Sequence, residues 1–337
     1  MSVISRLGRW TSLASAATFR QGIYKTRTVR RFARWLDPVP DPPLAVEIGV
    51  DRLAAVRWAG NGSVDDMAIE PLPPGAVVPS VVEPNLADAE TVRIAMSNVC
   101  KRLCAEDEDV AMLLPDPVIR VFVQHFEEFP RSPQEALPML RWKLKKSVPF
   151  GVDETLFSYM RQAPREGGVD VLTGFARLHI VREYEELAES VGLRAGVILT
   201  SSLAAVALLE EQNTTLLARV SDTVLTTAIV RDGVLCAYRC TELPARGNDL
   251  TPQMLLDEIF PATVYYKEIW QDDIQLIMVA GLGTRLREFI GPLQSEFQCS
   301  VKSLWHSSLS EGRIREEVRP FADSELEGLA GLMMNRS

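Results

Sequence analysis

A repeated strand–turn–strand pattern is the feature that most constrains how this chain can fold. Apolar runs broken by a tight turn predict one strand pair over residues 44–58 and a second pair over residues 216–230. A third apolar run over residues 274–279 ends at two glycines and predicts a buried strand followed by a helix. Two strand pairs that open the two halves of a 337-residue chain favour two α/β lobes.

The composition is that of a folded protein that does not bind nucleic acid in general. Apolar residues make up 47% of the chain and charged residues 24%, which allows a sizeable core, and the net charge of −9 disfavours a basic nucleic-acid-binding face. The five cysteines, an odd number, indicate a reducing compartment, and we interpret them as buried thiols rather than metal ligands. No apolar run reaches the roughly 20 residues that a membrane-spanning helix needs.

The first 43 residues differ in charge from the rest of the chain. Residues 1–36 contain eight Arg and Lys and no Asp or Glu. Near the end of this arm, apolar residues recur at the spacing of one helix face and basic residues at the spacing of the opposite face, which predicts a basic amphipathic helix. Its predicted contact residues are Arg27, Arg30, Arg31, Arg34, Phe32 and Trp35. An anionic membrane surface and an acidic neighbouring protein suit this pattern equally well. An Arg-rich, acid-free start also resembles a mitochondrial transit peptide. Residues 37–43 predict a stiff, Pro-rich linker.

Five segments, in this order, resemble the PilM family of type IV pilus assembly proteins, which belongs to the actin/FtsA-like superfamily. They read LAVEIGVDRLAAVRW, LKKSVPFGVDETLFSYM, LARVSDTVLTTAIVRDGVLCAYRCTEL, IQLIMVAGLGTRLREFIGPLQSEF and ELEGLAGLMM. Each segment alone is a weak signal, but together they are collinear over residues 44–335. The resemblance implies a two-lobed α/β actin-like (ribonuclease H-like) fold. Residues 44–109 would begin subdomain 1A, residues 110–194 would form an inserted SHS2-like subdomain 1C, and residues 195–337 would form the second lobe with the C-terminal helix.

The nucleotide motifs of that family are altered in this chain. They fall on Glu47, Gly49, Asp51, Arg219, Ser221, Gly281 and Gly283. The family carries Asp-x-Gly at the second hairpin, where Arg219 and Ser221 stand here. An Asp holds hydrated Mg²⁺ whereas an Arg repels it, and a serine Cβ obstructs the approach of backbone amides to phosphate. We therefore expect a degenerate ATPase fold with no catalytic residue and no metal site. Binding of ATP with Mg²⁺ stays open, because Arg219 can itself neutralise phosphate.

The resemblance also implies a partner and a place in the cell. PilM-like proteins bind the N-terminal peptide of the bitopic membrane protein PilN, and the groove would fall on Trp142, Val148, Pro149 and Phe150, which serve equally well as core residues of subdomain 1C. We expect a cytoplasmic scaffold associated with the inner membrane, with the pilus motor ATPase as a further partner. One alternative is a nucleotide-driven switch. Another is a domain like GspL of type II secretion, which continues into a membrane span, whereas this chain ends at Ser337 without one.

Overall fold

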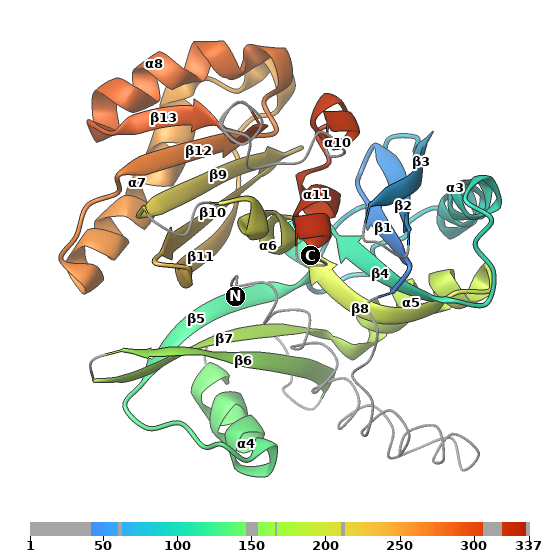
Figure 1. Ribbon diagram of the computed structural model, residues 1–337, viewed down its shortest axis with the longest axis horizontal. Helices are drawn as coiled ribbons and strands as arrows, with labels where there is room; N and C mark the ends of the chain where they lie inside the picture. Colours follow the sequence, from blue (N-terminus) through green and yellow to red (C-terminus); the bar gives the residue numbers. More distant parts are fainter. Residues whose placement is uncertain are drawn as a thin grey trace.

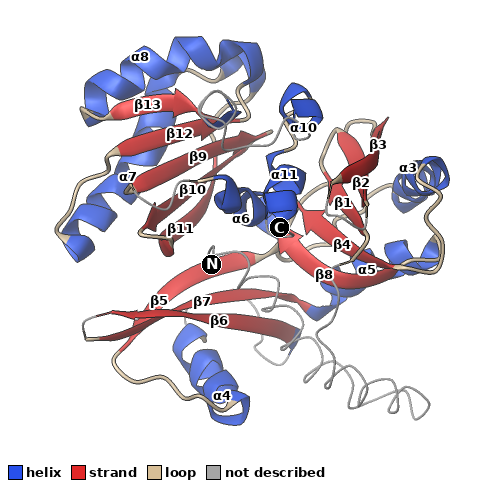
Figure 2. Ribbon diagram, in the orientation of Figure 1, coloured by secondary structure: helices blue, strands red, loops and turns tan. Residues whose placement is uncertain are grey.

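The computed structural model describes residues 42–59, 63–145, 154–165, 167–209, 213–305 and 319–334. The predicted contact residues of the arm (Arg27, Arg30, Arg31, Arg34, Phe32 and Trp35) and three of the predicted groove residues (Val148, Pro149 and Phe150) lie outside these ranges. The described chain forms two five-stranded sheets with helices packed on them and a separate three-stranded sheet with one helix (Figures 1 and 2).

The first lobe is a sheet of strand order β3-β2-β1-β4-β8. Its strands are β1 (Leu44–Ile48), β2 (Arg52–Trp58), β3 (Val64–Pro71), β4 (Asp109–Leu114) and β8 (Arg194–Thr200), and its helices are α3 (Ala89–Arg102) and α5 (Leu178–Ser190). The first three strands are antiparallel neighbours, whereas β1, β4 and β8 run parallel. Every residue of β1 is buried, which explains its nearly continuous apolar run.

The second lobe repeats this arrangement in the strand order β11-β10-β9-β12-β13. Its strands are β9 (Thr215–Ser221), β10 (Val224–Arg231), β11 (Val234–Glu242), β12 (Leu276–Ala280) and β13 (Ser300–Ser303), and its helices are α7 (Pro252–Trp270) and α8 (Leu286–Phe297). Here too three antiparallel strands are followed by parallel ones, since β12 pairs in parallel with both β9 and β13. The predicted two-lobed α/β organisation is confirmed.

The inserted unit is smaller than the sequence predicts. Its sheet, of order β5-β7-β6, consists of β5 (Arg120–Phe126), β6 (Thr155–Arg165) and β7 (Gly168–Arg177), with helix α4 (Pro133–Leu144) packed on it. The expected range of 110–194 also takes in most of β4 and all of α5, which belong to the first lobe because their apolar residues complete its core. The buried amide of Gln162 fixes the unit on the second lobe. It donates to the Leu235 carbonyl (2.7 Å) and accepts from the Leu235 N–H (2.9 Å).

Short helices fill the space between the two lobes (Figure 1). They are η1 (Asp116–Val118), α6 (Ser201–Ala205), η3 (Val206–Leu208), α10 (Arg319–Asp323) and α11 (Glu327–Met334). Helix α11 packs closely on α6, because a Cβ at Gly331 would lie 2.1 Å from the carbonyl oxygen of Ala204. One apolar core runs through this contact and includes Leu113 of the first lobe and Leu217 of the second. No helix among the described residues is both long and apolar enough to cross a bilayer.

Candidate functional site

A buried guanidinium joins the two lobes. Arg219 on β9 of the second lobe is only 6% exposed. Its Nε donates to Glu327 Oε2 on α11 (3.0 Å) and its Nη2 donates to Glu47 Oε1 on β1 of the first lobe (3.4 Å). Its Nη1 donates to Ser202 Oγ (3.2 Å) and lies 3.6 Å from Asp116 Oδ2. Arg219, Glu47, Asp116 and Glu327 are hereafter called the Arg219 cluster.

Helix N-termini help to position the carboxylates of this cluster. The Oε2 of Glu47 accepts the backbone N–H of Leu329 in the first turn of α11 (3.3 Å), and Asp116 Oδ1 accepts the N–H of Ser202 in α6 (2.9 Å). The hydroxyls of Ser202 and Thr226 also donate to Asp116. Orphan amides at the start of a helix are natural partners for carboxylates, so the short helices and the ion pairs stabilise one another.

Burial and charge shift the protonation equilibria in opposite directions. Burial raises the pKa of Glu47 above its ordinary value, and the positive charge of Arg219 opposes this rise. For Arg219, burial lowers the pKa, but the attraction of Glu327, Asp116 and Glu47 outweighs burial and leaves the pKa raised. Arg219 is therefore permanently charged, and its donors are already directed at protein acceptors. A bound phosphate or Mg²⁺ would have to displace these partners.

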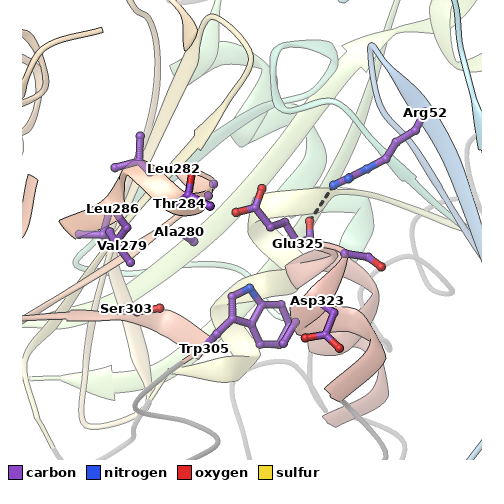
Figure 3. Close-up of a pocket in the computed structure, with 14 residues that line it drawn as sticks. Arg52, Val279, Ala280, Leu282, Thr284, Leu286, Ser303, Trp305, Asp323 and Glu325 are labelled. Atoms are coloured by element: carbon purple, nitrogen blue, oxygen red, sulfur yellow. Dashed lines mark hydrogen bonds between the residues drawn. The ribbon is translucent and has the colours of Figure 1, made fainter. Parts of the chain in front are cut away.

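A pocket of about 440 Å³ lies beside the cluster (Figure 3). Its walls come from the end of β12, the turn η5 (Gly283–Arg285), Trp305 and the segment between α10 and α11. Arg52 of the first lobe closes one side, where its Nη2 donates to the carbonyl of Glu325 (3.0 Å). Trp305 also borders the cluster, because its Nε1 donates to Glu327 Oε1 (2.9 Å).

The predicted motif residues are divided between these two places. Glu47 and Arg219 meet in the cluster, whereas Gly281 and Gly283 line the pocket. Gly281 has φ +76° and a Cβ there would lie 1.8 Å from the carbonyl oxygen of Val220, so only glycine fits between β12 and β9. The remaining motif residues, Gly49, Asp51 and Ser221, lie at the turns or strand ends of the hairpins. Trp142, 78% exposed, projects from α4 in the inserted unit.

Sequence reasoning missed three groups that complete the site. Asp116 lies two residues after the end of the buried strand β4, and Glu327 is the one charged residue in the last apolar helix. A charged residue at the end of a buried strand or inside an apolar helix is a signal that a partner must be present. Trp305 gave no such signal, because it follows the short strand β13 and its indole is positioned only by the tertiary fold.

The two repeated five-stranded sheets, with short helices between them, define a two-lobed, actin-like α/β fold. No family model and no curated protein matches the sequence. The chain is similar to a structure of the PilM–PilN type IV pilus biogenesis complex, with a TM-score of 0.65 and 18% identity over 87% of this chain and 98% of that chain. The predicted resemblance to PilM is thus confirmed as a likeness of fold.

Two further structures match less well. One is a Bacteroides thetaiotaomicron protein with an actin-like ATPase fold (TM-score 0.47, 9% identity, 77% of this chain and 90% of that chain). The other is the cytoplasmic domain of EpsL, an inner-membrane component of the type II secretion system of Vibrio cholerae (TM-score 0.44, 11% identity, 71% of this chain and 82% of that chain).

Proposed function

We propose that this chain is an actin-like scaffold of a type IV pilus assembly machine and that it does not hydrolyse ATP. The Arg219 cluster carries the proposal. A hydrolytic site in this fold needs a positioned metal ion and water. Here a guanidinium stands among three carboxylates at the meeting point of the hairpins, where a triphosphate would meet net negative charge. The scaffold would work in the cytoplasm, attached peripherally to the inner membrane.

Titration calorimetry and phosphate release test this proposal. We expect no release of phosphate above background from ATP with Mg²⁺ and no binding heat at micromolar protein. A catalytically competent actin-fold ATPase, run in parallel, shows that the assay detects turnover. Micromolar affinity together with turnover by the purified chain would overturn the proposal.

The partner we propose is the N-terminal cytoplasmic peptide of a PilN-like bitopic protein. The exposed indole of Trp142 on α4 supports this, because large aromatic side chains of this kind often anchor peptides. Fluorescence anisotropy with a labelled peptide from the PilN-like protein of the same organism measures the affinity. We expect the Trp142→Ala variant to bind at least about tenfold more weakly. A scrambled peptide and the Ile94→Ala variant, which truncates an exposed residue on α3, are the controls. Equal affinity for both variants would contradict the assignment.

A second candidate is a switch that responds to nucleotide without hydrolysing it. The pocket beside Gly281 favours this reading, because it stays open next to the filled cluster. Adenosine, ADP and ATP with Mg²⁺ compared in a thermal-shift assay separate the two functions. Stabilisation by adenosine and ADP alike would favour the switch, whereas no stabilisation favours the plain scaffold. Contact with the pilus motor ATPase stays a prediction.

A further inference from the structure

The apolar core beneath helix α4 is divided in two. Leu140 of this helix belongs to one cluster with Phe126, whereas Leu144 belongs to another with Phe157 and Phe175. Both clusters lie between α4 and the sheet of the inserted unit (Figure 1), and they contain only six and three buried residues. A helix that is held by two small clusters is displaced at lower cost than one packed on a continuous core.

Polar side chains separate the two clusters. Gln124 on β5 and Thr173 on β7 each stand two residues from members of both clusters on their own strands, so they share the face that α4 covers. They lie on neighbouring strands, because Gln124 pairs with Val171, two residues from Thr173. Arg141 of α4 faces the same layer, with its guanidinium carbon 5.7 Å from the centre of the Phe157 ring. Gln124, Thr173 and Arg141 are hereafter called the polar seam.

Each side chain of the polar seam keeps one buried atom without a hydrogen-bond partner in the part of the chain that the structure describes. These atoms are Gln124 Oε1, Arg141 Nε and Thr173 Oγ1, and Thr173 is fully buried. A buried polar group without a partner destabilises the folded state. Three such groups in one layer therefore indicate that their partner comes from outside the described fold.

The chemistry of the seam suits a peptide backbone. Gln124 Oε1 accepts a hydrogen bond, Arg141 Nε donates one, and the Thr173 hydroxyl can do either. An extended peptide offers N–H and C=O groups in alternation, which a single ion or an apolar side chain does not. We propose, on the basis of the proposed PilN-like partner, that the backbone of its peptide binds the polar seam when α4 is displaced from the sheet. Trp142 directly follows Arg141, so the exposed indole and the seam are adjacent along α4.

The double variant Gln124→Met/Thr173→Val tests the seam in the free protein, because it replaces both polar groups of the sheet by apolar groups of similar size. We expect a higher midpoint of urea unfolding than in the wild type, since two unpartnered groups are removed. The control is Thr215→Val, the same change at a buried threonine whose Oγ1 donates to the Asn213 carbonyl (3.3 Å), and it should lower the midpoint. A midpoint lowered in both variants would show that water already satisfies the seam and would overturn the proposal.

Peptide affinity supplies the second measurement. Fluorescence anisotropy with the labelled PilN-like peptide should give an affinity at least about tenfold weaker for the double variant, and an unchanged affinity for Thr215→Val. A gain in stability together with a loss of affinity is expected where a strained layer serves binding, and a folding defect does not produce it. In the wild-type complex, intermolecular nuclear Overhauser effects between peptide amides and the Thr173 methyl group should locate the peptide in the seam.

Two outcomes distinguish the seam from the partner itself. If the wild type binds the peptide, Trp142→Ala weakens binding and the double variant binds like the wild type, the seam is overturned and the partner stands. If the wild type does not bind the peptide, both fail. Nuclear Overhauser effects from the peptide to Trp142 but not to Thr173 would place the peptide on the outer face of α4 and would also overturn the seam.

Discussion

The Arg219 cluster and the pocket beside Gly281 are neighbours between the same two lobes, but they are built in opposite ways. The cluster is buried and filled with paired charges, whereas the pocket is open, and Arg52 donates a hydrogen bond to the Glu325 carbonyl at its edge. Trp305 borders both, since it lines the pocket and donates to Glu327. Between the same two lobes, buried ion pairs thus close one part of the contact, while the neighbouring part keeps a cavity of about 440 Å³.

Removing the guanidinium of Arg219 should disrupt the cluster and cause the largest loss of stability among the variants considered. Arg219→Ala leaves Glu47, Asp116 and Glu327 buried without their shared cation, which should lower the free energy of unfolding by about 3–5 kcal/mol. Urea denaturation at neutral pH measures the loss. The matched control is Arg93→Ala, which removes an exposed ion pair with Glu90 on α3 and should cost about 1 kcal/mol or less. A similar loss in both variants would mean that the cluster is not the main polar link between the lobes.

The second-largest loss of stability should come from helix α11, which carries Glu327 of the cluster. Gly331→Ala places a Cβ 2.1 Å from the Ala204 carbonyl oxygen, so α11 must move away from α6, and we expect a destabilisation of about 1–3 kcal/mol. Gly291→Ala on α8 meets open space and should instead stabilise the protein by up to about 1 kcal/mol. Thermal unfolding of the two variants measures the contrast. If both alanines stabilise, the close contact between α11 and α6 is not required.

Lowering the pH should reduce the difference in the free energy of unfolding between the wild type and Arg219→Ala. The folded-state pKa of Glu47 is raised by burial, and Arg219 limits the rise, so its loss raises this pKa further. A carboxyl whose pKa is raised on folding contributes stability that is present below its unfolded pKa of 4.5 and is lost as pH rises through the folded value. The deficit of the variant should thus shrink by about 1 kcal/mol or more as pH falls from neutral toward 5. A deficit independent of pH would show that Glu47 does not take up a proton.

Much of this arrangement could be predicted from the sequence, for identifiable reasons. The hairpins over residues 44–58 and 216–230 carry buried apolar runs that predict their strands. Arg219 was singled out only because it stands where the resemblance places a metal-binding Asp. The identity of its partner set could not be predicted, because Glu47, Asp116 and Glu327 are spread over 280 residues and meet only through tertiary packing. The extent of the inserted unit was also missed, since a buried strand such as β4 has the same pattern whichever sheet it joins.

The smallest loss of stability should come from a substitution at the pocket, Arg52→Ala. Arg52→Ala removes the hydrogen bond that its Nη2 donates to the Glu325 carbonyl, which is only partly buried, so we expect a loss of about 1 kcal/mol or less in urea denaturation. Burial and then the nearby Glu327 raise the pKa of Glu325, and Arg52 is one of the groups that oppose this rise. The variant should therefore show a slightly higher pKa for Glu325, which NMR titration of its carboxyl carbon measures. A loss as large as that of Arg219→Ala would mean that the lobes are held together from the pocket side, and the contrast between the two halves of the site would fail.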